Sequence, residues 1–107
     1  MASAAPPVVV YSGHMFEQDC AEEPALAARI AAALDALDTR EAFGPLACGA
    51  DILIAEAVLA RGGRVNVVLP FAEDDFIAES VLCGGAEWLP RYHACRDDRG
   101  EWRLTAV

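Results

Sequence analysis

Short runs of β-branched and apolar residues alternate along the chain with segments of helical periodicity. Residues 8–11 read Val-Val-Val-Tyr and are followed by Ser12 and Gly13, a pattern that predicts a buried strand. From Pro24, which suits the first turn of a helix, apolar residues recur at helical spacing. The residues expected to face a sheet from this helix are Leu26, Ile30, Ala33, Leu34 and Leu37.

The alternation continues through the middle of the chain. Residues 43–48 predict a second short strand, and 51–61 predict a helix that ends at Gly62 and Gly63. Residues 64–71, RVNVVLPF, predict a third strand that is apolar enough to be buried on both faces.

The last third of the chain predicts further helix and one more strand. A helix is expected from the acidic residues 73–75, with Phe76, Ile77 and Val81 facing inward. Further helical turns bend around Pro90, and residues 101–107 alternate as a fourth strand.

This order of elements predicts an α/β fold: a Rossmann-like three-layer sandwich with a mostly parallel sheet and right-handed crossovers. A length of 107 residues fits one domain, residues 1–107. The pattern ends on a strand where a Rossmann-like sheet usually continues, so we expect the domain to be one piece of a longer protein.

Composition narrows the range of partners. Seventeen acidic residues outweigh eight arginines, and the formal net charge is -9. A nucleic-acid partner is not expected, because binding a phosphate backbone requires a basic face. Charged residues interrupt the longest apolar run before it reaches the length of a membrane span, and the N-terminus does not resemble a signal peptide. We therefore expect a cytoplasmic protein with no membrane partner.

The four cysteines form no CxxC pair and are expected to be reduced thiols. Cys83, His93 and Cys95 match no known zinc-ligand spacing. The sequence predicts neither a metal site nor a cofactor.

In parallel α/β sheets, ligands bind beyond the carboxyl ends of the strands. Gly13 and Gly49 follow two of the predicted strands, and glycine lets the backbone approach a ligand closely. Free N–H groups at the start of the helix 51–61 would face an anion. The candidate ligand-binding residues are Ser12, Gly13, His14, Cys48, Gly49, Ala50, Asp51, Pro70 and Phe71.

Several of the chemically interesting residues have a structural alternative. Asp51 fits a helix N-cap better than a ligand group, although one role does not exclude the other. Glu56 lies within an apolar helix, where it is either exposed, paired with an arginine or directed at a ligand. His14 and Glu56 are weak catalytic candidates, and Cys48 fits a small buried residue better than a nucleophile.

The segments VVVYSGH and GPLACGADILIAEAVLARGGRVNVVLPFAEDDF resemble the SLOG superfamily of Rossmann-like domains, over about residues 8–95. This superfamily includes DNA-processing protein A and the LOG phosphoribohydrolases. The closest similarity is to SLOG-type domains attached to tetratricopeptide-repeat or cyclase signalling proteins. The resemblance implies a pocket for a nucleotide or nucleotide derivative formed by Gly13, His14, Gly49, Ala50, Asp51 and Pro70. The PGGxGT motif of the LOG enzymes is absent, which argues against their activity.

The sequence therefore predicts a sensor domain that binds a nucleotide-like small molecule and signals occupancy to attached effector domains, rather than an enzyme. One alternative is a hydrolase of N-glycosidic bonds that uses Glu56 or Asp51 as its acid–base group. Another is a structural dimerisation module with a vestigial pocket. Because the helix 51–61 is apolar almost all round, we also expect a homodimer in which a second subunit covers its outer side.

Overall fold

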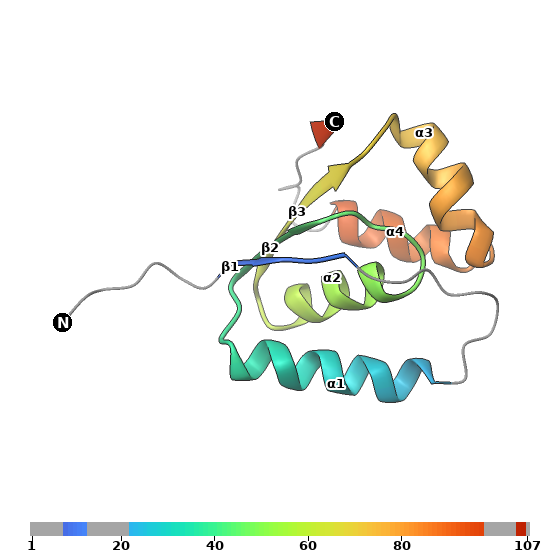
Figure 1. Ribbon diagram of the computed structural model, residues 1–107. Helices are drawn as coiled ribbons and strands as arrows, with labels where there is room; N and C mark the ends of the chain where they lie inside the picture. Colours follow the sequence, from blue (N-terminus) through green and yellow to red (C-terminus); the bar gives the residue numbers. More distant parts are fainter. Residues whose placement is uncertain (1–7, 13–21, 98–104, 107) are drawn as a thin grey trace.

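The computed structural model describes residues 8–12, 22–97 and 105–106, and Figure 1 shows an α/β fold. All strand pairs are parallel, and the strand order in the sheet is β1-β2-β3-β4. The predicted α/β class with a parallel sheet is therefore confirmed. The strands are β1 (Val8–Val10), β2 (Glu41–Gly44), β3 (Arg64–Leu69) and β4 (Thr105–Ala106).

The helices begin and end close to the positions that the sequence predicts. None of those in the described residues is long and apolar enough to cross a membrane. They are α1 (Glu23–Ala36), α2 (Ala50–Ala60), α3 (Glu73–Phe76) and α4 (Trp88–Asp97), and α3 continues into the π-helical η1 (Ile77–Val81) and the 3₁₀-helical η2 (Leu82–Gly84).

One face of the sheet packs against α2 and lines the core. Ala42 of β2 and Val65, Val67 and Leu69 of β3 are buried there, and α2 contacts both strands. On β1, by contrast, the side chains of Val8 and Val10 are 52% and 81% exposed. The prediction that residues 8–11 form a buried strand is wrong for these two valines, because they lie on the face of β1 opposite Val9 and Tyr11, which pack in the core. The third layer of the expected sandwich stays a prediction.

The strand β3 is also only partly buried on its second face. Arg64 is exposed and Val68 is half-buried, whereas Asn66 is buried. The amide of Asn66 donates to Oε2 of Glu41 at 2.9 Å and to the Ala42 carbonyl at 3.3 Å. The expectation of burial on both faces therefore fails for Arg64, and a polar pair occupies part of this face.

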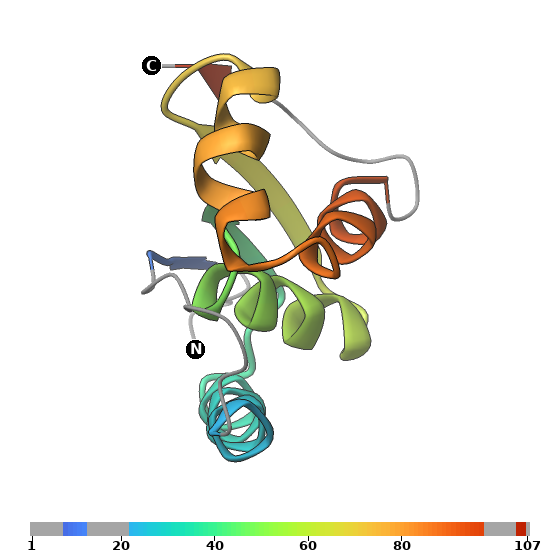
Figure 2. The same cartoon turned by 90° about the vertical axis from the view of Figure 1, so that its right-hand side faces the viewer.

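The helix α1 packs against α2 and not against the sheet, so the predicted packing of α1 is wrong. Figures 1 and 2 show α2 between the strands and α1. Of the five residues expected to face inward from α1, Leu34 is buried, Leu26 and Ile30 are half-buried, and Ala33 and Leu37 are exposed. The inward residues of α1 reach the core beside α2: Leu34 belongs to the same buried cluster as Ile52, Ala55 and Val58 of α2, and Ile30 packs against that cluster.

The apolar surface of α2 is covered within the chain. The sheet lies on one side of α2, while α1 and α4 contact other sides. The buried apolar residues of the helix are Ile52, Leu53, Ala55 and Val58. No partner subunit is therefore needed to cover α2, and the homodimer stays a prediction without that support.

Candidate functional site

The carboxyl ends of the strands open at one edge of the sheet, because all the strand pairs are parallel. Ser12 is exposed just after β1, while Gly13 and His14 lie outside the described residues. Pro70 and Phe71 are exposed after β3, and the Phe71 ring packs against Phe76 with the ring centroids 5.8 Å apart. The structure thus places Ser12, Pro70 and Phe71 at the expected edge.

The turn from β2 into α2 carries the other candidates. Gly49 is the N-cap residue of α2, with a φ of 100° that favours glycine, and no side chain caps this helix end by a hydrogen bond. Ala50 and Asp51 are therefore the first and second residues of the helix. The prediction that Asp51 is the N-cap is wrong, because Gly49 has already taken that place.

Asp51 nevertheless stabilises the turn from inside. Its side chain is 2% exposed, and its Oδ2 accepts a hydrogen bond from the backbone N–H of Ala47 at 3.3 Å. A carboxylate in the first turn of a helix also interacts favourably with the positive end of the helix dipole. The charge of Asp51 thus makes the turn less attractive to strongly anionic ligands.

Tyr11 connects β1 to the same turn, a role that the sequence did not suggest. Its hydroxyl donates to the Pro45 carbonyl at 2.9 Å, and its backbone N–H donates to the Phe43 carbonyl at 3.0 Å. The ring lies directly over Gly44, where a Cβ would come within 2.6 Å of the Cζ of Tyr11. The only sequence signal for this contact is an aromatic residue at the end of one strand and a glycine at the end of the next.

The phenol of Tyr11 is held neutral. Burial raises the pKa of Tyr11 well above its ordinary value, and the negative charge of Asp51 raises it further, with a contribution from Cys95. A buried neutral hydroxyl with a carbonyl acceptor fixes position and supplies no charge. Tyr11 and Asp51 are thus the buried supports of the β2–α2 turn.

The other side of the turn touches the helical segment that follows α3. The backbone N–H of Cys48 donates to the Ser80 carbonyl at 2.7 Å. The Cys48 sulfur lies 3.6 Å from that of Cys83 in η2. Cys48 is fully buried, as the sequence favoured, whereas Cys83 is exposed.

Glu56 is engaged by an arginine, one of the three possibilities that the sequence left open. The Arg91 guanidinium donates to both of its carboxylate oxygens, with distances of 2.6 Å and 2.9 Å. Arg91 also lies 3.3 Å from the Glu23 carboxylate and 4.3 Å from the centre of the Trp88 ring. The hydrogen bond to Glu56 raises the pKa of Arg91 despite partial burial, so the guanidinium stays charged and links α2, α4 and α1.

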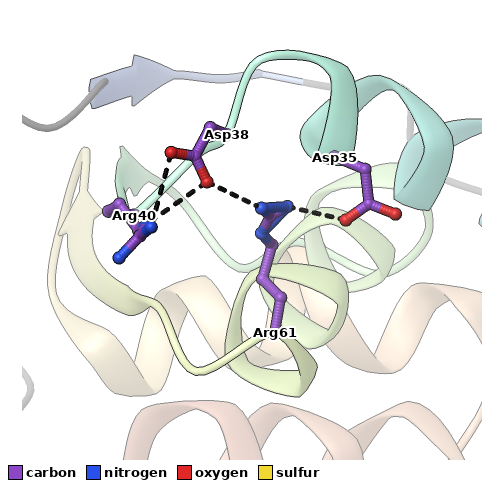
Figure 3. A network of polar contacts seen from close by, with 4 residues as sticks. All are labelled: Asp35, Asp38, Arg40 and Arg61. Atoms are coloured by element: carbon purple, nitrogen blue, oxygen red, sulfur yellow. Dashed lines mark hydrogen bonds and ion pairs between the residues drawn. The ribbon is translucent and has the colours of Figure 1, made fainter.

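The carboxyl end of α2 is built from charged side chains (Figure 3). Arg61 lies 2.9 Å from the carboxylate of Asp35 and 3.4 Å from that of Asp38, and Arg40 pairs with Asp38 at 3.2 Å. The hydrogen bond from Arg40, with help from Arg61, lowers the pKa of Asp38. This cluster fastens the end of α1 to the end of α2, away from the carboxyl edge of the sheet.

No group of three or more His, Cys, Asp and Glu side chains in the described part of the chain is placed to hold a metal ion. No protein-family model matches the chain, and no curated protein or solved structure matches it significantly. The resemblance to the SLOG superfamily therefore rests on the residues quoted above.

Proposed function

We propose that this protein is a sensor domain that binds a nucleotide or a nucleotide-derived small molecule at the carboxyl edge of its sheet. The observation that carries the proposal is the start of α2, which has a glycine N-cap and no capping side chain. The N–H groups of a first helical turn suit a phosphate or another anionic group. Ser12, at the end of the adjacent strand, supplies a hydroxyl at the same edge.

The charges around this edge favour a ligand of modest charge. Residues 8–12 and 45–51 include no arginine or lysine, and Asp51 adds a buried negative charge. A triphosphate would meet no positive side chain from these segments. A nucleoside monophosphate, or an ADP-ribose-like compound with one phosphate near α2, fits the arrangement better.

Hydrolysis of an N-glycosidic bond is less well supported. Both oxygens of Glu56 accept hydrogen bonds from Arg91, which occupies the carboxylate that an acid–base mechanism would use. Asp51 is buried and bonded to the turn. The proposal keeps a cytoplasmic location and attached effector domains that respond to occupancy, and a homodimer is not required for it.

Calorimetric titration with AMP, ADP and ADP-ribose, with adenosine as the uncharged control, tests the proposal. We expect at least one phosphate-bearing compound to bind more tightly than adenosine. At a concentration of 100 Kd, such a ligand stabilises the folded state by about 2.7 kcal/mol, which raises the melting temperature. If none of the three compounds binds at millimolar concentration, the proposal is wrong for this ligand class.

A matched pair of substitutions at Ala50 locates the site. Ala50 is half-exposed and is the first residue of α2, where glutamate is compatible with the helix dipole. We expect Ala50→Glu to weaken binding at least tenfold by repulsion, and Ala50→Gln, which has the same shape without the charge, to weaken it much less. Equal losses for the two variants would show that charge at this turn does not matter.

A further inference from the structure

We propose that Cys48 and Cys83 form a peroxide-responsive dithiol, in which the exposed Cys83 is oxidised first and the buried Cys48 resolves it into a disulfide. The two sulfur atoms are 3.6 Å apart, although the residues are separated by 35 positions in the sequence. A disulfide has a sulfur–sulfur distance of about 2.05 Å, so the atoms need to approach by about 1.5 Å. This modification site goes beyond the proposed ligand binding and does not depend on it.

The backbone already holds the two segments together. The N–H of Cys48 donates to the carbonyl of Ser80 at 2.7 Å, three residues before Cys83. This bond fixes the side of the turn that faces the segment carrying Cys83.

The segment that carries Cys83 is well suited to the remaining movement. It is a short 3₁₀ turn that directly follows a π-helical stretch. Such irregular helical geometry is often found at functional sites. Gly85, with a φ of 122°, follows it. We expect η2 to move and the buried Cys48 to stay in place.

The different exposure of the two thiols sets the order of the reaction. The exposed thiol of Cys83 gives up its proton as its sulfur attacks hydrogen peroxide. The O–O bond breaks, an S–O bond forms, and the leaving hydroxide takes up that proton, so a sulfenic acid and one water result. The sulfur of Cys48 then attacks the sulfur of Cys83. The S–O bond breaks, the S–S bond forms, and the hydroxyl leaves as a second water with the proton of the Cys48 thiol. Overall, two thiols lose two electrons and two protons, and one peroxide becomes two waters.

The experiment treats the folded protein with a slight excess of hydrogen peroxide, in a Cys20→Ser background because Cys20 lies outside the described residues. Intact mass and peptide mapping follow the products. We expect a loss of about 2 Da, one linked peptide pair that contains Cys48 and Cys83, and full reversal by dithiothreitol. The same oxidation in urea should lose this selectivity, because the pairing depends on the folded arrangement.

Three variants, each checked for folding by circular dichroism, test the assigned roles. Cys48→Ser should leave Cys83 as a sulfenic acid that dimedone traps, whereas Cys83→Ser should abolish the linkage. Cys95→Ser, which removes a buried thiol of α4, should still form the linkage at the rate of the parent protein. A folded parent protein that links Cys95, links only between molecules, or over-oxidises Cys83 without a linkage would overturn the proposal.

Discussion

The two ends of α2 are held in opposite ways. At its amino end, the β2–α2 turn is supported by buried groups: the Tyr11 ring over Gly44, and the Asp51 carboxylate bonded to the Ala47 N–H. At its carboxyl end, Arg61 pairs with Asp35 and Asp38, whose side chains are 75% and 62% exposed. Buried contacts have few alternative arrangements, whereas exposed ion pairs are weak and screened by salt.

This difference suggests a division of roles along the helix. The amino end must keep the N–H groups of its first turn in a fixed position if they are to receive a ligand. The carboxyl end fastens α1 to α2, and we expect it to tolerate variation in the exposed carboxylates of Asp35 and Asp38. The variants below should therefore have large effects at the amino end and small effects at the carboxyl end.

The largest effect is expected from Gly44→Ala. The added Cβ would lie 2.6 Å from the Tyr11 ring, so the ring or the strand must shift. We expect a loss of about 3 kcal/mol in the free energy of unfolding, as for other overpacked cores. Denaturant unfolding measures the loss.

Two controls separate this crowding from other causes. Gly62→Ala, just beyond the carboxyl end of α2, meets no atom within 4 Å but has a φ of 82°. It should cost only about 1 kcal/mol from backbone strain. In a Tyr11→Ala background, Gly44→Ala should become much less costly. If its cost is unchanged there, the ring contact is not the reason.

Removal of the buried carboxylate of Asp51 comes next. Asp51→Ala leaves the N–H of Ala47 without this acceptor, and we expect a cost of about 2 kcal/mol. Asp51→Asn keeps an oxygen that can accept the bond and should cost less. Thermal and denaturant unfolding of both variants measure these costs. A cost of less than about 0.5 kcal/mol for Asp51→Ala would contradict the stabilising role given to the Asp51 carboxylate.

The Tyr11 hydroxyl gives the amino end a characteristic sensitivity to alkaline pH. Because the pKa of Tyr11 is raised in the folded state, its contribution to stability is complete below the unfolded pKa of 10.0 and is lost as pH rises above it. Above that pKa, we expect the free energy of unfolding to fall by up to about 1.4 kcal/mol per pH unit.

We expect Tyr11→Phe to remove the part of the stability loss at alkaline pH that comes from Tyr11. At neutral pH it should lower the free energy of unfolding by about 1 kcal/mol, because the hydrogen bond to the Pro45 carbonyl is lost. The pKa of Tyr92 is also raised, by burial and by its hydrogen bond to Glu73, so some alkaline sensitivity should remain in Tyr11→Phe. An unchanged slope between pH 10 and 11 would contradict the role given to Tyr11.

The smallest effect is expected at the carboxyl end of α2. Asp35→Asn removes one exposed ion pair of Arg61 and should cost no more than about 0.5 kcal/mol, a cost that should disappear in about 1 M NaCl. Because the pKa of Asp38 is lowered in the folded state, its contribution is present above the unfolded value of 3.8 and is lost as pH falls through the folded value. A loss at Asp35→Asn as large as that of Asp51→Ala would remove the contrast between the two ends.

The sequence predicted the elements well because strand and helix periodicities are local. It placed Gly49 at the start of α2 and identified the edge of the sheet where Ser12 lies. It placed the second strand too late, at residues 43–48, whereas β2 is Glu41–Gly44 and residues 45–48 already belong to the turn. It failed for α1, because an apolar stripe shows that a helix is covered and does not show what covers it. The stripe of α1 meets α2 and not the strands.

The contacts that build the candidate site were harder to predict because they join distant residues. Glu56 and Arg91 are 35 positions apart, as are Cys48 and Cys83. Tyr11 and Pro45 are 34 positions apart. The first pair depends on the packing of α4 against α2, the second on the position of η2 beside the turn, and the third on the pairing of β1 with β2. No local pattern contains that information.

Ligand binding at the amino end of α2 is tested most directly by titrating the ¹⁵N-labelled protein with ADP-ribose or AMP and recording the amide chemical shifts. We expect the amide signals of Ser12, Ala50, Asp51 and Ile52 to shift together as ligand is added, while those of Asp35, Asp38 and Arg61 do not shift. Shifts concentrated at the carboxyl end of α2, or no shifts at millimolar ligand, would contradict it.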